Sequence, residues 1–244
     1  MAIPKIIHQV WIGKKRLPTR WTRDCLEVKD CHPDWEYKLW RNKDVPALLN
    51  KFPKNVRNAY VRYWKAGQWA FACDILRYMI LHEYGGVYMD CDFVMVENGT
   101  LNILPLEKNL ILMNMLKSAP QIPRIQIRLQ NCFMASTPQH KFIKRVLDRI
   151  DNIDYTLTTM AGLPCDKYNT QYLTTEYSIY LGRPFSQTTG IQKIQEDISN
   201  IIPSDEALIP EYYFTGKKAK IATHLYKKTH NRNKSLTEKQ NALL

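Results

Sequence analysis

The amino-acid sequence predicts an α/β fold with a mostly parallel central sheet, and three observations support that prediction. Segments with the periodicity of strands alternate with segments of helical periodicity along most of the chain. The composition is that of a globular protein, with 45% hydrophobic and 24% charged residues among 244. No apolar run approaches the roughly 18 to 20 residues that a membrane-spanning helix needs. A chain of this length can bury roughly 70% of its unfolded surface, which excludes disorder as a general description.

The first part of the chain contains two predicted strands and two predicted helices. Residues 5–12 are rich in β-branched and aromatic side chains, which predicts a strand. Residues 18–29 have a helical pattern, and residues 35–40 alternate as a second strand. A short helix is expected from Val45, with Asp44 at its cap and a proline in its first turn.

The central part predicts a long helix that is followed at once by a strand. Residues 68–82 are rich in Ala, Leu, Ile and Met, and Gly85 and Gly86 supply the left-handed conformation that ends a helix. Residues 87–94 then read as a strand. Further elements are predicted beyond residue 100, namely strands at 109–116 and 131–135 and an amphipathic helix that begins at Thr137.

Positive charge is in excess but unevenly distributed. The chain carries 35 Lys and Arg against 23 Asp and Glu, a formal net charge of +12. Residues 1–65 hold 15 basic and 6 acidic side chains, residues 66–110 hold 2 and 6, and residues 215–244 hold 8 and 1. Basic ends around an acidic segment are compatible with a footprint for nucleic acid or an anionic membrane. They are equally compatible with a site for a phosphate-bearing ligand that also holds a cation.

Two carboxylates form the first candidate site. Asp90 and Asp92 stand two residues apart on the predicted strand 87–94, so both side chains should project from the same face at its carboxyl end. Neighbouring carboxylates repel each other unless a cation joins them, and a divalent metal is the usual solution. The alternative is that both are solvated residues of a loop.

A second pair lies upstream on the predicted long helix. Asp74 and Arg77 are three residues apart and therefore share a helix face. They can form a simple ion pair within the helix, or they can bind the hydroxyl groups of a sugar as acceptor and donor together. The spacing alone leaves both interpretations open.

Two strings carry the most specific pattern in the sequence, A-C-D-I-L-R-Y-M-I-L at 72–81 and Y-G-G-V-Y-M-D-C-D at 84–92. Together they resemble the signature of the DxD sugar transferases of glycosyltransferase family thirty-two, which includes the yeast initiating α-1,6-mannosyltransferase and capsular polysaccharide transferases. The large clostridial glucosylating toxins carry a related arrangement. Other segments also resemble the family, namely Ile3–Gly13, Pro33–Trp40, Asn131–Ser136 and the closing A-x-H at Ala222-Thr223-His224.

The resemblance implies a GT-A fold, that is, a single Rossmann-like domain that binds a nucleotide sugar, over residues 1–230. Residues 231–244 are then a basic C-terminal tail, in which a capping-box pattern is compatible with a short helix.

The resemblance also implies roles for individual residues. Asp90, Asp92 and His224 match positions that hold a divalent metal, and a set rich in oxygen ligands suits Mn²⁺ or Mg²⁺ better than zinc. The positions that match donor-binding residues are Val10, Trp11, Asp74, Arg77, Asp90 and Asn131. The implied catalytic residues are Asp90, Asp92 and Arg77.

The implied activity is the metal-dependent, retaining transfer of a hexose from a UDP- or GDP-sugar to a glycan, glycolipid or glycoprotein acceptor. Two other functions fit parts of the sequence. The string from Asp90 to Val94 also fits the phosphoaspartate motif of haloacid-dehalogenase-like phosphatases, although the later acidic pair of that family is not evident. A basic nucleic-acid-binding domain is the third reading; the sequence has no helix-turn-helix or zinc module, and we expect no nucleic-acid partner.

The expected location of the chain determines the expected redox state of its cysteines. Met1–Lys5 lacks the apolar core of a signal peptide, so we expect a cytoplasmic protein, with peripheral membrane contact through its basic surface as a further expectation. The six cysteines include no C-x-x-C pair and no zinc-ligand spacing. Reduced and mostly buried thiols are therefore expected.

Overall fold

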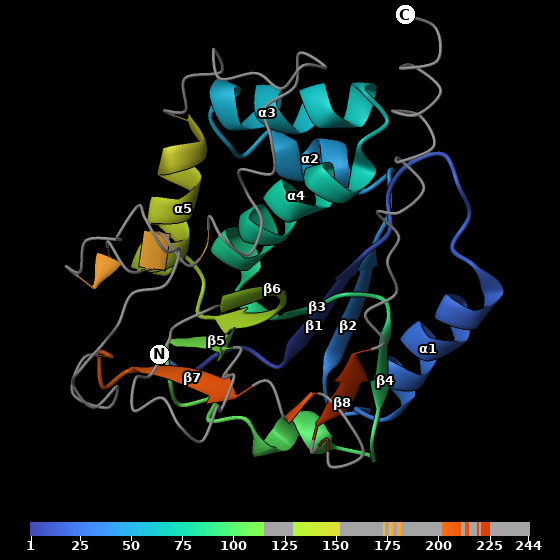
Figure 1. Ribbon diagram of the computed structural model, residues 1–244, viewed down its shortest axis with the longest axis vertical. Helices are drawn as coiled ribbons and strands as arrows, with labels where there is room; N and C mark the ends of the chain where they lie inside the picture. The colour runs from blue at the N-terminus through green and yellow to red at the C-terminus, as the bar shows by residue number, and fades with distance from the viewer. Residues whose placement is uncertain are drawn as a thin grey trace, which may run out of the picture.

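A six-stranded sheet in the order β2-β1-β3-β6-β5-β7 lies at the centre of the fold (Figure 1). The computed structural model describes residues 1–114, 129–151, 173, 176–177, 180–181, 202–210, 213–214, 219 and 221–224. The strands of this sheet are β1 (Ile6–Val10), β2 (Glu36–Trp40), β3 (Gly86–Met89), β5 (Leu110–Asn114), β6 (Leu129–Ser136) and β7 (Glu206–Pro210). Strand β6 runs antiparallel to its neighbours β3 and β5, whereas the other strand pairs in the sheet are parallel. The predicted α/β class with a mostly parallel sheet is confirmed.

Helices cover both faces of the sheet. They are α1 (Thr19–Asp30), α2 (Val45–Leu49), α3 (Lys54–Lys65), α4 (Trp69–Tyr84) and α5 (Lys141–Asp151). Helices α2 to α5 lie together in Figure 1, and their apolar side chains share one core cluster with one face of the sheet. Helix α1 lies apart from them, and its buried residues contribute to the clusters of the opposite face.

The strand β3 shows how the sheet is buried between these layers. Tyr88 belongs to the cluster beneath the four helices, whereas Val87 and Met89 belong to the cluster on the other face. All three residues are at most 1% exposed. Alternation with both faces apolar is what a strand covered on both sides requires.

The predicted continuous strand at 87–94 is wrong. Strand β3 ends at Met89, a turn follows at Asp90–Asp92, and the chain resumes in a short strand β4 (Phe93–Met95). Strand β4 leaves the central sheet and pairs with β8 (Ala222–His224) in a separate two-stranded antiparallel sheet. The Asp90 carbonyl accepts a hydrogen bond from the Gln9 side chain, and Asp90 and Asp92 lie in this turn rather than on a continuous strand.

The other predicted elements agree with the structure apart from the start of one helix, whereas α3, η1, β7 and β8 had no predicted counterpart. Residues 54–65 carry no predicted element, yet they form α3. Helix α5 starts at Lys141 rather than at Thr137, because Gln139 has a positive φ of 54° that a helix does not allow. A 3₁₀ helix, η1 (Thr100–Ile103), precedes β5. Residues 115–116 of the predicted strand, residues 225–230 and the predicted tail 231–244 lie outside the described residues.

Among the residues that the structure describes, no helix is both long enough and apolar enough to cross a bilayer.

The Gly85-Gly86 turn brings β3 directly beside β1. Both glycines have positive φ, 63° and 86°. A Cβ atom on Gly86 would lie 2.6 Å from the carbonyl oxygen of Ile6 in β1, so no larger residue fits there without a shift. The buried His8 ring, in β1, lies 3.0 Å from the Gly85 carbonyl oxygen through Nε2. The turn therefore sets the position from which β3 runs toward Asp90.

Candidate functional site

The candidate site lies where β1 and β3 end. These strands are parallel neighbours, so their carboxyl ends meet at one edge of the sheet. Trp11 follows β1 and Asp90 follows β3. Ligands of open α/β sheets bind at this edge. Helix α4 and strand β6 bring further polar side chains to the same place.

A buried arginine connects three of these elements. The Arg77 guanidinium, on α4, donates through Nη2 to Asp74 Oδ1 at 2.8 Å and through Nη1 to the Asn131 carbonyl oxygen at 2.5 Å. Its Nη1 also lies 3.4 Å from Asp90 Oδ1. Asn131 Nδ2 donates to Asp74 Oδ1 at 2.9 Å, which closes the network. The structure thus brings together four residues that the sequence nominated.

The charge of this network is maintained despite burial. The Arg77 and Asp74 side chains are 6% and 12% exposed. Burial works to lower the pKa of Arg77, but the nearby oxygens of Tyr88, Asp90 and Asp74 raise that pKa well above its ordinary value. The guanidinium therefore stays charged, and it can orient carboxylates without exchanging protons.

Tyr88 is a site residue to which the sequence analysis gives no role. Its ring lies under the Arg77 guanidinium, with the Cζ atom 4.7 Å from the ring centroid, and its hydroxyl donates to Asp90 Oδ1 at 2.7 Å. Burial raises the pKa of Tyr88 well above its usual value, so the hydroxyl remains a donor. The signal was its alternation with Asp90, which puts both side chains on one side of the chain.

The Asp90–Asp92 turn is also held through its main chain. The Asp90 amide donates to the Cys132 carbonyl oxygen at 2.9 Å. The Gln9 amide group donates to the Asp90 carbonyl oxygen at 3.1 Å, and Tyr37 Oη donates to Gln9 Oε1 at 2.7 Å. Gln9 and Tyr37 also lacked a predicted role. A fully buried glutamine in an apolar strand is the signal that could have found the first of them.

The two carboxylates of the turn are only partly buried. The Asp90 side chain is 32% exposed, and Asp92 is half-buried. Hard divalent cations such as Mg²⁺ are often bound by one or two carboxylates together with phosphates of the substrate. Within the described residues, no group of three or more His, Cys, Asp and Glu side chains is arranged to hold a metal ion. Among those residues, Asp90 and Asp92 could contribute carboxylate ligands to such a metal, with further ligands supplied from elsewhere.

The backbone pairing of β8 with β4 defines the position of His224. Strand β8 pairs His224 with Phe93, which directly follows Asp92. The backbone of the third nominated metal ligand is thus adjacent to the carboxylate turn.

Val10 and Trp11 lie at the end of β1. The Val10 side chain is 6% exposed and packs into the core beneath the helices. Trp11 is half-buried, its Nε1 donates to the Lys15 carbonyl oxygen at 3.0 Å, and its ring meets the edge of Trp21 at a centroid distance of 5.1 Å. Trp11 is therefore held in one orientation at the edge of the site.

The sequence is similar to those of known sugar transferases. Residues 18–111 match the family described as the glycosyltransferase sugar-binding region containing the DXD motif. Inositol phosphoceramide mannosyltransferase 3 of Schizosaccharomyces pombe is 35% identical over 102 residues, which are 37% of this chain and 24% of the relative. Inositol phosphoceramide mannosyltransferase 1 of the same yeast is 25% identical over 186 residues, 70% of this chain and 48% of the relative. The chain thus spans between 24% and 48% of the length of these relatives.

A solved structure shows the same fold. The PaToxG glycosyltransferase superposes with a TM-score of 0.55 at 19% identity, over 74% of this chain and 71% of that chain. The GT-A fold expected from the sequence is confirmed, and so is the resemblance to DXD-motif sugar transferases.

Proposed function

Because the chain carries the DXD-motif sugar-binding region of the glycosyltransferases, we propose that it transfers a hexose from a UDP- or GDP-sugar to an acceptor, with retention of configuration and with a divalent metal. The observation that carries the proposal is the network of Asp74, Arg77, Asn131 and Asp90 beside the carboxylate turn. The family match favours this activity over the phosphatase and nucleic-acid-binding alternatives.

The sugar of the donor is assigned to Asp74, Arg77 and Asn131. These side chains hold one another through charged hydrogen bonds, so they are oriented before a ligand arrives. A preorganised site saves the entropy that ordering on binding would cost. Carboxylate, guanidinium and amide groups together offer the acceptors and donors that the vicinal hydroxyls of a hexose need.

The metal is assigned to Asp90 and Asp92, with His224 as the third candidate ligand. Tyr88 and Arg77 engage one oxygen of Asp90, which fixes the direction of that carboxylate. Neutralisation of the leaving nucleotide diphosphate is the chemistry that bound Mn²⁺ or Mg²⁺ supplies. Val10 and Trp11 are assigned to the nucleobase, with the indole as the stacking surface.

The acceptor is assigned as an anionic lipid that binds at the same edge of the sheet as the donor. Both relatives are named for inositol phosphoceramide, and the loop after β1 is strongly basic. The exposed cations here are Lys14, Lys15 and Arg16 in the loop and Arg20 and Arg23 at the start of α1. Residues 14–23 contain no acidic side chain. Positive charge beside the donor site favours a phosphate-bearing acceptor and peripheral contact with an anionic membrane.

Hydrolysis of nucleotide sugars in the presence of Mn²⁺ tests the donor assignment. The purified chain should release free hexose from at least one of UDP-glucose, UDP-galactose and GDP-mannose. Asp92→Ala should reduce the rate by at least about 100-fold, the scale on which removal of one electrostatic stabiliser acts. Asp34→Ala is the matched control, because it removes an exposed carboxylate that pairs with Lys5. Equal rates for wild type and Asp92→Ala would contradict the proposal.

The predicted retention of anomeric configuration is tested separately from donor hydrolysis. Proton NMR of the product formed with a soluble acceptor should show the anomeric configuration of the donor. An inverted product would refute this part of the proposal.

A further inference from the structure

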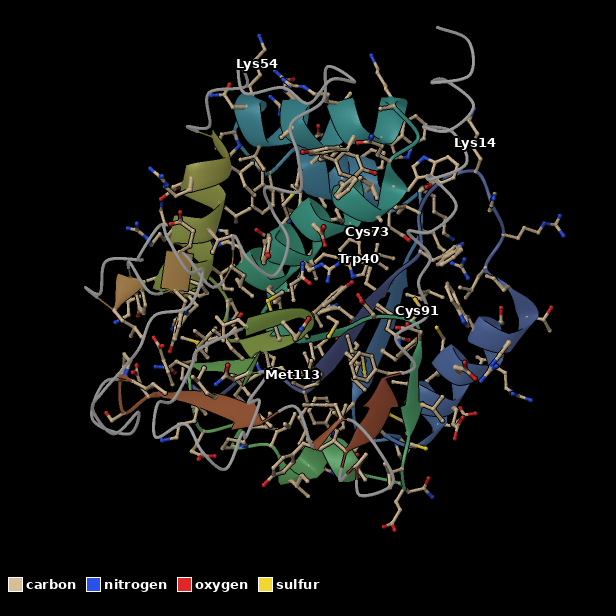
Figure 2. The ribbon with its side chains drawn as sticks, in the orientation of Figure 1. Lys14, Trp40, Lys54, Cys73, Cys91 and Met113 are labelled. Carbon is tan, nitrogen blue, oxygen red and sulfur yellow. The ribbon has the colours of Figure 1, made fainter. Side chains whose placement is uncertain are left out.

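Two cysteines meet behind the carboxylate turn. Cys25 lies on α1, and Cys91 is the central residue of the turn, between Asp90 and Asp92. They are 2% and 6% exposed, and together with Leu17 they form a small buried apolar cluster. Figure 2 labels Cys91 near the start of β4, and helix α1 packs against β4.

The contacts of the two thiols show how close they are. Cys25 Sγ lies 4.0 Å from the Cys91 carbonyl oxygen, and Cys91 Sγ donates to the Val10 carbonyl oxygen at 3.4 Å. All five described cysteines are free thiols, so the pair is reduced in this state.

We propose that Cys25 and Cys91 are a site of reversible oxidation, at which a peroxide forms a disulfide that withdraws the carboxylate turn from its working position. The Cys25 thiolate attacks hydrogen peroxide and becomes a sulfenic acid while hydroxide leaves. Cys91 then displaces hydroxide from that sulfur, so two thiols and one peroxide yield one disulfide and two waters. A dithiol reductant reverses the step by thiol exchange.

The consequence for the turn follows from disulfide geometry. A disulfide requires the two sulfurs to approach to about 2.05 Å with a specific dihedral angle. Cys91 must then give up its hydrogen bond to Val10 and move toward α1. Asp90 and Asp92 flank Cys91 directly, so their carboxylates move with it. A displacement of about 1 Å in a catalytic group is enough to cost about 100-fold in rate. This functional half of the inference rests on the proposed function.

Thiol counting by mass spectrometry tests the covalent half without any assay of activity. The chain has six cysteines. After peroxide treatment, unfolding and alkylation, the oxidised protein should carry two fewer alkyl groups than the reduced protein, and a proteolytic digest should contain one cross-linked peptide that joins Cys25 to Cys91. Cys25→Ser and Cys91→Ser should each abolish this peptide. Cys31→Ser, which changes a buried cysteine at the end of the same helix, should retain it. Absence of the cross-link, or its persistence in Cys25→Ser, would overturn the inference.

Donor hydrolysis tests the functional half. The oxidised wild type should hydrolyse the donor at least tenfold more slowly than the reduced protein, and dithiothreitol should restore the rate. Cys25→Ser should keep its own rate after peroxide treatment. Loss of activity through methionine oxidation would persist in Cys25→Ser and resist dithiothreitol, and that result would overturn the switch. If the reduced wild type is inactive, the proposed function fails, whereas the mass measurement still decides whether the disulfide forms.

Discussion

The Arg77 side chain joins a helix, a turn and a strand through one guanidinium. It contacts Asp74 on α4, Asp90 in the turn and the Asn131 carbonyl on β6. The sequence predicted that these residues belong to one site, and the structure brings them within hydrogen-bonding or ion-pair distance. Their roles in binding a donor remain predictions. Tyr88 and Gln9 could not be found in the same way, because a buried polar residue acquires a function only through neighbours that the fold supplies.

Removal of Arg77 should cost stability as well as activity. Arg77→Ala leaves the Asp74 carboxylate buried without its cation, which should lower the free energy of unfolding by about 3 to 5 kcal/mol in urea titrations. Arg77→Lys retains the charge but lacks the planar fork, so it should cost less stability and yet still fail in donor hydrolysis. Full activity of Arg77→Lys would show that charge alone is sufficient and that the fork has no role.

His8 makes stability depend on pH. Burial is the main cause that lowers its pKa from 6.5 to about 4, with Trp40 Nε1 donating to its Nδ1 at 3.3 Å. The unfolded chain therefore binds a proton that the folded chain excludes, so this contribution is complete above pH 6.5 and is lost as pH falls toward 4. Between pH 7.5 and pH 4.5, wild type should lose about 2 to 3 kcal/mol more than His8→Gln in urea unfolding. Parallel pH profiles for the two proteins would contradict this account.

At the scale of elements, the spacing between β1 and β3 depends on Gly86. Gly86→Ala places a Cβ atom 2.6 Å from the Ile6 carbonyl oxygen at a φ of 86°, so it should cost more than about 3 kcal/mol in thermal or urea unfolding, or prevent folding. Gly67→Ala is the matched control. Its φ is 72° and no neighbouring atom of the described residues lies within 4 Å of the added Cβ, so it should cost only about 1 to 2 kcal/mol. Equal losses would mean that backbone conformation, and not close packing of the strands, explains Gly86.

Element types were predicted more successfully than element directions and ends. The strand periodicity of β6 was readable, but period two is the same for a strand running either way, so its antiparallel direction was not. The residue after β3 bonds through its carbonyl to Gln9, a contact distant in sequence that the strand pattern does not reveal. Helix α3 is different, because Val56, Ala59, Tyr60 and Tyr63 are buried at helical spacing and the signal was present in the sequence.

At the scale of the whole molecule, the charges that sum to +12 are distributed unevenly, and the acidic and basic regions are assigned to different ligands. The acidic segment 66–110 includes the carboxylates assigned to the metal, and the basic loop after β1 borders them. Vesicle sedimentation tests the assignment of that loop. Wild type should bind phosphatidylserine vesicles and not phosphatidylcholine vesicles, and binding should weaken as salt increases.

Charge-reversal variants distinguish the contribution of this loop to vesicle binding from the contribution of the net charge of the protein. K14E/K15E/R16E should weaken binding to anionic vesicles by at least tenfold, since each cation near such a surface contributes about 1 kcal/mol. K43E/K54E/K65E changes the charge equally at exposed lysines on other elements and should have a smaller effect. If the two triple variants bind equally weakly, net charge and not the loop governs the contact.

The order of strands in the sheet also has a consequence during synthesis. Ile7 pairs with Val87, and Leu110 pairs with Glu206, so neighbouring strands are separated by long stretches of chain. Translation proceeds at about 5 to 20 residues per second, so β5 waits roughly 5 to 20 seconds before β7 emerges. During that interval the outer edge of β5 exposes unpaired amide and carbonyl groups, which are a template for association with other chains. The nascent protein is therefore exposed to aggregation through this edge until β7 leaves the ribosome.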